Sequence, residues 1–189
     1  MSKLVAVDLE TTGLNPLAHE TWEVGIVPVD PDATTMHYQF QPESLGTAEA
    51  GALKVNHFYE RFDWIGDPRI CRDMLTEDDE KPGSFAVTVA AEACWLIAKE
   101  LEGATIMGLN PHFDARFLEV LLRKYGHVPL WHHRHLDLGS FVAGAWGAKH
   151  ELSGAAIRER LPQDEGLHNA FADAQWNVMV YESIVGRER

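Results

Sequence analysis

The sequence predicts a mixed-sheet α/β domain, and three observations support this fold class. Strand-like runs follow one another near the N-terminus, in the order expected of a meander. Helical stripes and short apolar runs alternate after them. The chain has 189 residues, of which 46% are hydrophobic, so a single domain can bury a substantial core.

The first half contains three predicted strands and a short helical region. Residues 3–9 form an apolar run, and residues 20–29 alternate and are rich in β-branched side chains. Pro31 and the aspartate after it turn the chain toward a third strand at 37–40. Residues 48–61 have the pattern of one or two short helices.

The composition changes between residues 63 and 83. This stretch holds two Gly/Pro turn signals and the acidic run 77–80, and it contains no recognisable motif. We therefore expect a surface insertion at 63–83 within a single domain that spans 1–189. A solvated loop is the simplest interpretation, and a lid or a partner surface are the alternatives.

The second half predicts alternating helices and strands. A helix is expected after a Ser84 cap, with an apolar stripe that starts at Val87. A strand at 104–109 leads to a helix that begins with the cap–proline pair Asn110-Pro111. The remaining predicted elements are a strand near 135–138 and helices at 151–161 and 169–185.

The formal net charge is −13, from 16 Lys and Arg against 29 Asp and Glu. Such acidity argues against tight, extended binding to a nucleic-acid duplex. It does not exclude an enzyme that binds one end of a nucleic-acid strand through metal ions, because bound cations reverse the sign of the local electric field. Cys71 and Cys94 make no disulfide framework, and we expect a cytoplasmic protein without signal peptide or membrane span.

Two carboxylates lie at the end of the first predicted strand. Asp8 and Glu10 are two residues apart, so they project from the same face of the strand. Thr11, Thr12 and Gly13 then make a polar turn at the carboxyl end, where open α/β sheets bind ligands. A solvated strand end that carries two acids is the alternative interpretation.

Two further acids and a histidine lie at helix starts. Asp114 falls in the first turns of a helix that follows a buried strand, although an ordinary surface acid would also suit the helix dipole there. Asp173 lies on a stripe of the last helix that faces the core, where an unpaired charge is costly. His168 precedes that helix, and a loop histidine taken alone is more often an exposed bystander.

Three segments that are far apart in the sequence thus each carry an acid at the end of an apolar strand or helix. Mg²⁺ and Mn²⁺ prefer clustered oxygen ligands of this kind. A histidine beside such a cluster suits the role of a general base toward water. The pattern therefore predicts a divalent metal site formed by Asp8, Glu10, Asp114 and Asp173, with His168 as the base.

The motifs "DLETTG", "NPHFD" and "HNAFADA" carry these residues and resemble the three exonuclease motifs of the DEDDh family. These are the DnaQ-like 3′→5′ exonucleases of the ribonuclease H-like superfamily. Each motif alone is weak, whereas the ordered set is highly specific. The segments "ALKVNHF" and "HELSGAAIRERLP" extend the resemblance over most of the chain except 63–83. The resemblance implies a ribonuclease H-like mixed sheet of about five strands, the first three antiparallel, flanked by helices.

The resemblance also implies an activity. Family members remove nucleotides from the 3′ ends of single-stranded DNA or RNA, or of short oligonucleotides, and release nucleoside 5′-monophosphates. Two Mg²⁺ or Mn²⁺ ions would be held by Asp8, Glu10 and Asp173, with Asp114 supporting the second ion through water. His168 would accept a proton from the attacking water.

A pocket for the terminal nucleotide follows from the same resemblance. Thr11, Thr12 and Leu14 would line it, the leucine as an apolar wedge beneath the base. His57 and Phe58 match the opposite wall, where an aromatic ring can stack on a base. Ordinary packing in the core is the alternative for Phe58.

Several alternatives stay open from the sequence. A catalytically silent module that binds nucleic-acid ends or associates with a polymerase could keep the fold, but it would be free to lose one of the acids. DNA proofreading and RNA trimming both fit, and the chain end soon after the last helix favours a free-standing trimming nuclease. Many family members are dimers, and no interface is identified. The motif "WHHRH" contains His132, His133 and His135, which suggest a zinc site as a further alternative. No cysteine or carboxylate with matching spacing lies nearby in the sequence to complete the ligand set.

Overall fold

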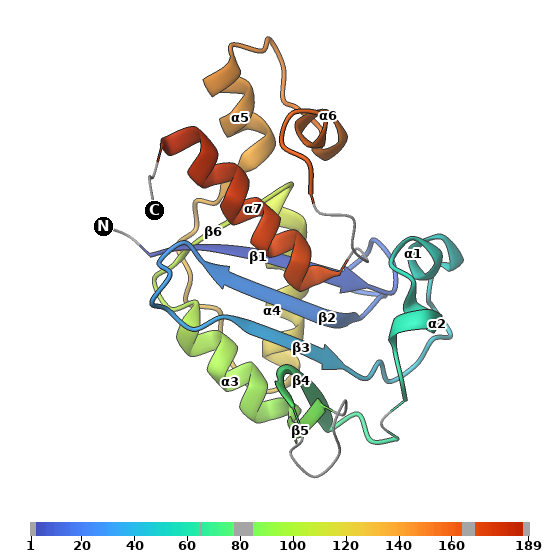
Figure 1. The fold of residues 1–189 in the computed structure, drawn as a ribbon. Helices are drawn as coiled ribbons and strands as arrows, with labels where there is room; N and C mark the ends of the chain where they lie inside the picture. Colours follow the sequence, from blue (N-terminus) through green and yellow to red (C-terminus); the bar gives the residue numbers. More distant parts are fainter. Residues whose placement is uncertain (1–2, 65, 78–84, 164–168, 187–189) are drawn as a thin grey trace.

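The computed structural model describes residues 3–64, 66–77, 85–163 and 169–186. These residues form one mixed sheet of seven strands in the order β5-β4-β3-β2-β1-β6-β7, flanked by helices (Figure 1). The predicted α/β class is confirmed. The sheet has two strands more than expected, because β4 and β5 extend its edge beyond β3.

The centre of the sheet comes from the first three strands. β1 (Leu4–Thr11) pairs antiparallel with β2 (Thr21–Pro28), and β2 pairs antiparallel with β3 (Met36–Phe40), as predicted. On the other side, β6 (Thr105–Gly108) lies parallel to β1, and β7 (Leu136–Asp137) lies parallel to β6. Because β1 and β6 are parallel neighbours, their carboxyl ends lie side by side at the same end of the sheet.

The segment expected to be a surface insertion is partly sheet. β4 (Ile70–Glu77) pairs with β3 and with β5 (Phe85–Val89), and residues 65 and 78–83 lie outside the described residues. The polar composition concealed this strand because only one of its faces packs inward, where Cys71 is fully buried. The expected helix likewise starts later, at Ala90, since the β-branched Val87 and its neighbours belong to β5.

Helices cover both faces of the sheet. α3 (Ala90–Glu100) and α4 (Pro111–Lys124) pack on the face formed by the odd-numbered residues of β1. The opposite face, which includes Ala6, packs against α5 (Leu138–Trp146), α6 (Gly154–Arg158) and α7 (Ala170–Val185). In Figure 1, α7 crosses this face in front of β1 and β2. Because side chains alternate along a strand, Asp8 and Glu10 project toward α7.

Two short helices, α1 (Ala50–Val55) and α2 (Phe58–Arg61), occupy the region predicted to be helical between β3 and β4. They pack through a small aromatic cluster on Trp22 of β2. None of the helices in the described part of the chain is long and apolar enough to cross a membrane.

Candidate metal centre

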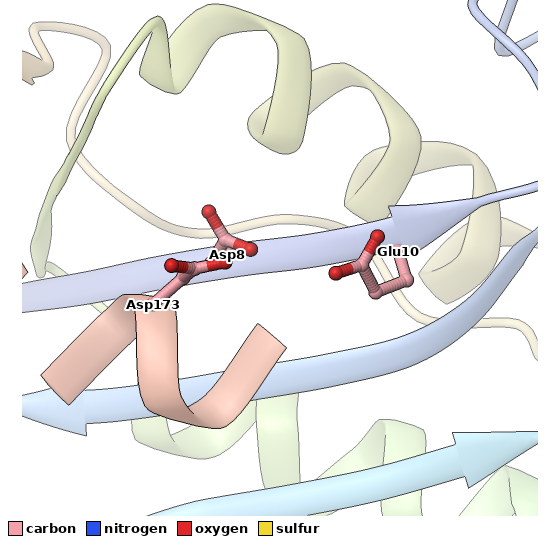
Figure 2. Close-up of side chains that lie close together, drawn as sticks. All are labelled: Asp8, Glu10 and Asp173. Carbon is pink, nitrogen blue, oxygen red and sulfur yellow. The ribbon is translucent and has the colours of Figure 1, made fainter. Parts of the chain in front are cut away.

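Three of the predicted acids converge between β1 and α7. Ligand oxygens of Asp8, Glu10 and Asp173 all lie within 4.8 Å of one another. Figure 2 shows the carboxylate of Asp173 beside that of Asp8, with Glu10 further along β1. Residues 165 positions apart in the chain are thus close in space, which the order of the motifs could not reveal by itself.

Asp114 is the fourth acid of the centre. It is buried at the start of α4, and its Oδ1 accepts a hydrogen bond from the backbone amide of Leu9 at 3.1 Å. Leu9 stands between Asp8 and Glu10 in β1, so Asp114 is fixed to the strand that carries both. After burial, the charge of Asp114 is the largest cause of the raised pKa of Asp8.

Burial raises the pKa of three of these acids, Asp8, Glu10 and Asp114. Burial, followed by the charges of Asp114, Asp173 and Glu10, raises the pKa of Asp8 well above its usual value. Burial and the charge of Glu23 raise the pKa of Glu10 to about 8. Burial also raises the pKa of Asp114 to about 8. An all-oxygen donor set with unbalanced negative charge fits a hard divalent cation such as Mg²⁺ or Mn²⁺.

Asp173 accepts hydrogen bonds from two residues in or just after α6, Arg158 and Gln163. Arg158 Nη2 and Gln163 Nε2 both donate to Asp173 Oδ1, at 3.1 and 2.9 Å. Arg158 Nε also donates to Gln163 Oε1, at 3.0 Å, and its guanidinium lies 4.3 Å over the ring of Trp176. The carboxylate is therefore oriented by a braced pair of donors, which sequence motifs did not indicate.

The predicted general base, His168, lies outside the described residues, and its role stays a prediction. The described chain resumes at Asn169, whose side chain caps α7 by accepting from the amide of Ala172 at 2.8 Å. The N-terminus of α7 therefore follows directly after residue 168, beside Asp173 in its first turn.

The turn after β1 carries three residues of the predicted nucleotide pocket, Thr11, Thr12 and Leu14. Thr11 and Thr12 are buried, and their hydroxyls are used inside the turn: Thr11 donates to the carbonyl of Gly13, and Thr12 accepts from the amide of Glu20. Leu14 is 70% exposed and borders a cavity of about 210 Å³. Phe113, His112 and Arg116 of α4 line the other side of that cavity.

The opposite wall differs from the expectation at one residue. Phe58 is fully buried in the aromatic cluster with Trp22 and Phe62, so its ring is not open to a nucleotide base. His57 is exposed, with a backbone φ of 53°, and borders a cavity of about 360 Å³. Tyr59, 70% exposed on the rim of the same cavity, is the accessible aromatic ring there. Stacking by Phe58 is therefore excluded, and ordinary packing explains this residue.

The histidines of "WHHRH" form ring contacts and no ligand set. His132 contacts His133 and His135 contacts His112, with ring centroids 4.4 and 4.7 Å apart. Across the described ranges, Asp8, Glu10 and Asp173 are the one group of three His, Cys, Asp or Glu side chains whose donor atoms converge on a cation-sized site. The zinc alternative thus has no support from geometry.

The fold is that of known exonuclease structures. E. coli Exonuclease I in complex with a 5cy-dA13 oligonucleotide has a TM-score of 0.62 and 15% identity to this chain, and the match covers 99% of this chain and 42% of that one. Its complex with a dA16 oligonucleotide has a TM-score of 0.66, 12% identity and the same coverage. The zinc-bound form of its complex with single-stranded DNA has a TM-score of 0.61, 13% identity, and coverage of 98% and 40%.

No family model matches the sequence, and no curated protein matches it significantly. The chain spans less than half the length of the structures that it resembles. At 12 to 15% identity, the likeness concerns the fold. This chain has the same fold as the part of E. coli Exonuclease I that it matches.

Proposed function

We propose that this protein is a metal-dependent 3′→5′ exonuclease that removes nucleoside 5′-monophosphates from single-stranded nucleic acid or short oligonucleotides. The observation that carries the proposal is that ligand oxygens of Asp8, Glu10 and Asp173 converge on one site, while Asp114 is hydrogen-bonded to Leu9 between the first two. A structural role would not require four mutually repelling carboxylates at the carboxyl end of β1. The fold shared with Exonuclease I supports the same reaction class.

Each acid has a proposed task. Asp8, Glu10 and Asp173 would hold one divalent ion, and Asp8 with Asp114 would hold a second. Such ions, when bound, lower the pKa of water and neutralise charge on the scissile phosphate. His168, just before α7, accepts the proton of the attacking water. The turn at Leu14 and the exposed His57 seat the terminal nucleotide on either side.

Single strands are the proposed substrate class. Exonuclease I structures contain single-stranded oligonucleotides, and Leu14 and His57 each border a small cavity. A net charge of −13 disfavours extended backbone contacts, so binding would concentrate at the 3′ end. Contacts to the 2′-OH would decide between RNA and DNA, so matched strands of both are compared as substrates.

The test is degradation of matched 5′-labelled single-stranded DNA and RNA in Mg²⁺, in Mn²⁺ and in EDTA. We expect a ladder that shortens from the 3′ end, requires metal, and disappears in Asp8→Ala and Asp173→Ala. Asp32→Ala, which removes an exposed acid of the β2–β3 loop, is the matched control and should cleave normally. Full activity of Asp173→Ala would refute the site assignment. Metal-dependent binding of oligonucleotide ends without cleavage would favour the silent module.

A further inference from the structure

Glu23 is a buried carboxylate at the centre of a polar network beside the candidate metal centre. It lies on β2 directly opposite Glu10 of β1 and is fully buried. Its Oε1 is within hydrogen-bond distance of His37 Nε2 at 3.0 Å and accepts from Gln39 Nε2 at 3.2 Å. Its Oε2 accepts from Arg61 and from the backbone amide of Ala170 at 3.2 Å. Four segments of the chain therefore meet on one carboxylate.

This network fixes the first turn of α7. The Ala170 amide that donates to Glu23 is at the first residue of α7, three residues before Asp173. Two residues along β2 on the same face, Gly25 touches the same turn, since a Cβ there would lie 2.3 Å from the Ala170 carbonyl. On β3, the ring of His37 stacks on Phe171 with centroids 5.2 Å apart. The position of α7 on the sheet is thus set beside Glu23.

Arg61 connects the same carboxylate to the acid cluster. Its guanidinium pairs with Glu23 and lies 3.9 Å from Glu10 Oε1, and only 7% of its side chain is exposed. It also donates to the carbonyl of Asn56 at 2.9 Å and packs over the ring of Trp22. Asn56 in turn donates to the carbonyl of Thr11 at 2.9 Å. Arg61 therefore braces both the strand end and the turn that follow Asp8.

Glu23 and Arg61 form an ion pair of opposite charges. Burial alone would raise the pKa of Glu23, but the hydrogen bond from His37 and the charge of Arg61 lower it below its usual value. Glu23 is therefore ionised at neutral pH, and Arg61 neutralises it. If Glu23 were neutral, the Arg61 charge would be left to pair with Glu10 instead of with Glu23.

We propose that Glu23 is a positioning residue of the metal centre, which with Arg61 fixes the first turn of α7, and hence Asp173, against the strand that bears Asp8 and Glu10. The inference rests on the proposed function for its catalytic consequence. Residues that orient metal ligands typically change metal affinity by about 10- to 100-fold when they are replaced. Glu23 acts on the ligands and does not itself contact the reacting groups.

The test is Glu23→Gln, a replacement of the same shape without the charge. We expect Mn²⁺ affinity, measured by electron paramagnetic resonance without substrate, to fall by about 10-fold or more. The amide of Ala170 should exchange faster with solvent. The kcat should fall while KM for an oligonucleotide changes little. Glu43→Gln, which removes the charge of an exposed glutamate paired with Lys124, is the matched control and should change none of these.

Arg61→Lys is the second variant, because it keeps the buried charge compensated while losing the forked contacts to Glu23, Asn56 and Glu10. It should fold and show a smaller loss of Mn²⁺ affinity in the same direction. Wild-type Mn²⁺ affinity in both variants, or failure of both to fold, would overturn the positioning role. Absence of Mn²⁺ binding and cleavage in the unaltered protein would instead refute the proposed function, while Ala170 exchange in Glu23→Gln would still report on the position of α7.

Discussion

Asp114 accepts a hydrogen bond from the backbone amide of Leu9, the residue between Asp8 and Glu10. The pairing of β1 with β6 ends at Ala6, so the amide of Leu9 takes its partner from α4 instead of from a neighbouring strand. A main-chain hydrogen bond therefore fixes the acid of the helix to the strand that bears Asp8 and Glu10. One side of the metal centre is preorganised by a main-chain contact.

This contact separates the structural and the metal-binding roles of Asp114. In Asp114→Asn the side-chain oxygen can still accept from Leu9, while the charge is lost. We expect unchanged or higher thermal stability, because a buried carboxylate with a raised pKa is removed, and about 10- to 100-fold lower nuclease activity. Asp114→Ala should lose activity and stability together, since the Leu9 amide is left unsatisfied. Thermal melts and initial rates check both; equal melting temperatures for the two variants would contradict the structural role of the bond.

The raised pKa values predict that the metal-free protein loses stability as pH rises. The folded protein keeps protons on Glu10 and Asp114 up to about pH 8, whereas the unfolded chain releases them near pH 4 to 4.5. Between those values the folded state binds more protons, so the free energy of unfolding decreases as pH rises through this range.

Urea unfolding in EDTA from pH 5 to 9 measures this slope, with Glu10→Gln expected to flatten it. Mn²⁺ should oppose the loss, and its stabilising effect should grow with pH because binding displaces protons. A stability of the wild-type protein that is constant over this range would show that the acids ionise normally without metal.

His168 should matter for the chemistry more than for the metal. Replacing a general base typically costs about 100-fold or more in rate. We therefore expect His168→Ala to lower kcat to that extent while Mn²⁺ affinity stays within a few-fold of the wild type. Single-turnover rates and Mn²⁺ titrations of the same preparation separate the two effects. A parallel loss of metal affinity would place the histidine among the ligands instead.

The sequence predicted those features that depend on local pattern. Alternation in β1 put Asp8 and Glu10 on one face, and the stripe of α7 put Asp173 toward the sheet; both are confirmed. The burial of Phe58 could not be predicted, because a one-turn helix has no periodicity and its inner face is chosen by contact with Trp22. Glu23 was missed for a related reason.

A single charged residue inside an apolar strand ordinarily faces solvent. Glu23 is buried instead, and its charge is compensated by an arginine 38 positions away in the chain. The strand β4 also depends on a distant partner, since its polar residues become an edge of the sheet only beside β3. Such features are decided by tertiary contacts, which a single sequence does not display.

Leu14 and Phe58 should separate binding from stability, because Leu14 is exposed at the proposed terminal pocket whereas Phe58 is buried in the cluster with Trp22. Leu14→Ala removes an exposed side chain, so we expect little change in melting temperature and a higher KM for oligonucleotides. Phe58→Ala opens a cavity in the cluster with Trp22 and should cost about 3 to 5 kcal/mol. Tyr59→Ala is the control for stacking on that wall and should raise KM without loss of stability.

Arg158 and Gln163 form the braced pair of donors on Asp173. Arg158→Met keeps an apolar side chain over Trp176 but removes the donor to Asp173 and the support of Gln163. If the pair orients the ligand, Mn²⁺ affinity should fall by about 10-fold, with Arg158→Lys intermediate. If Arg158 instead competed with the ion for Asp173, the same variant would bind Mn²⁺ more tightly. Calorimetric titration of the three proteins distinguishes these signs, and tighter binding by Arg158→Met would show that the arginine blocks the site until metal displaces it.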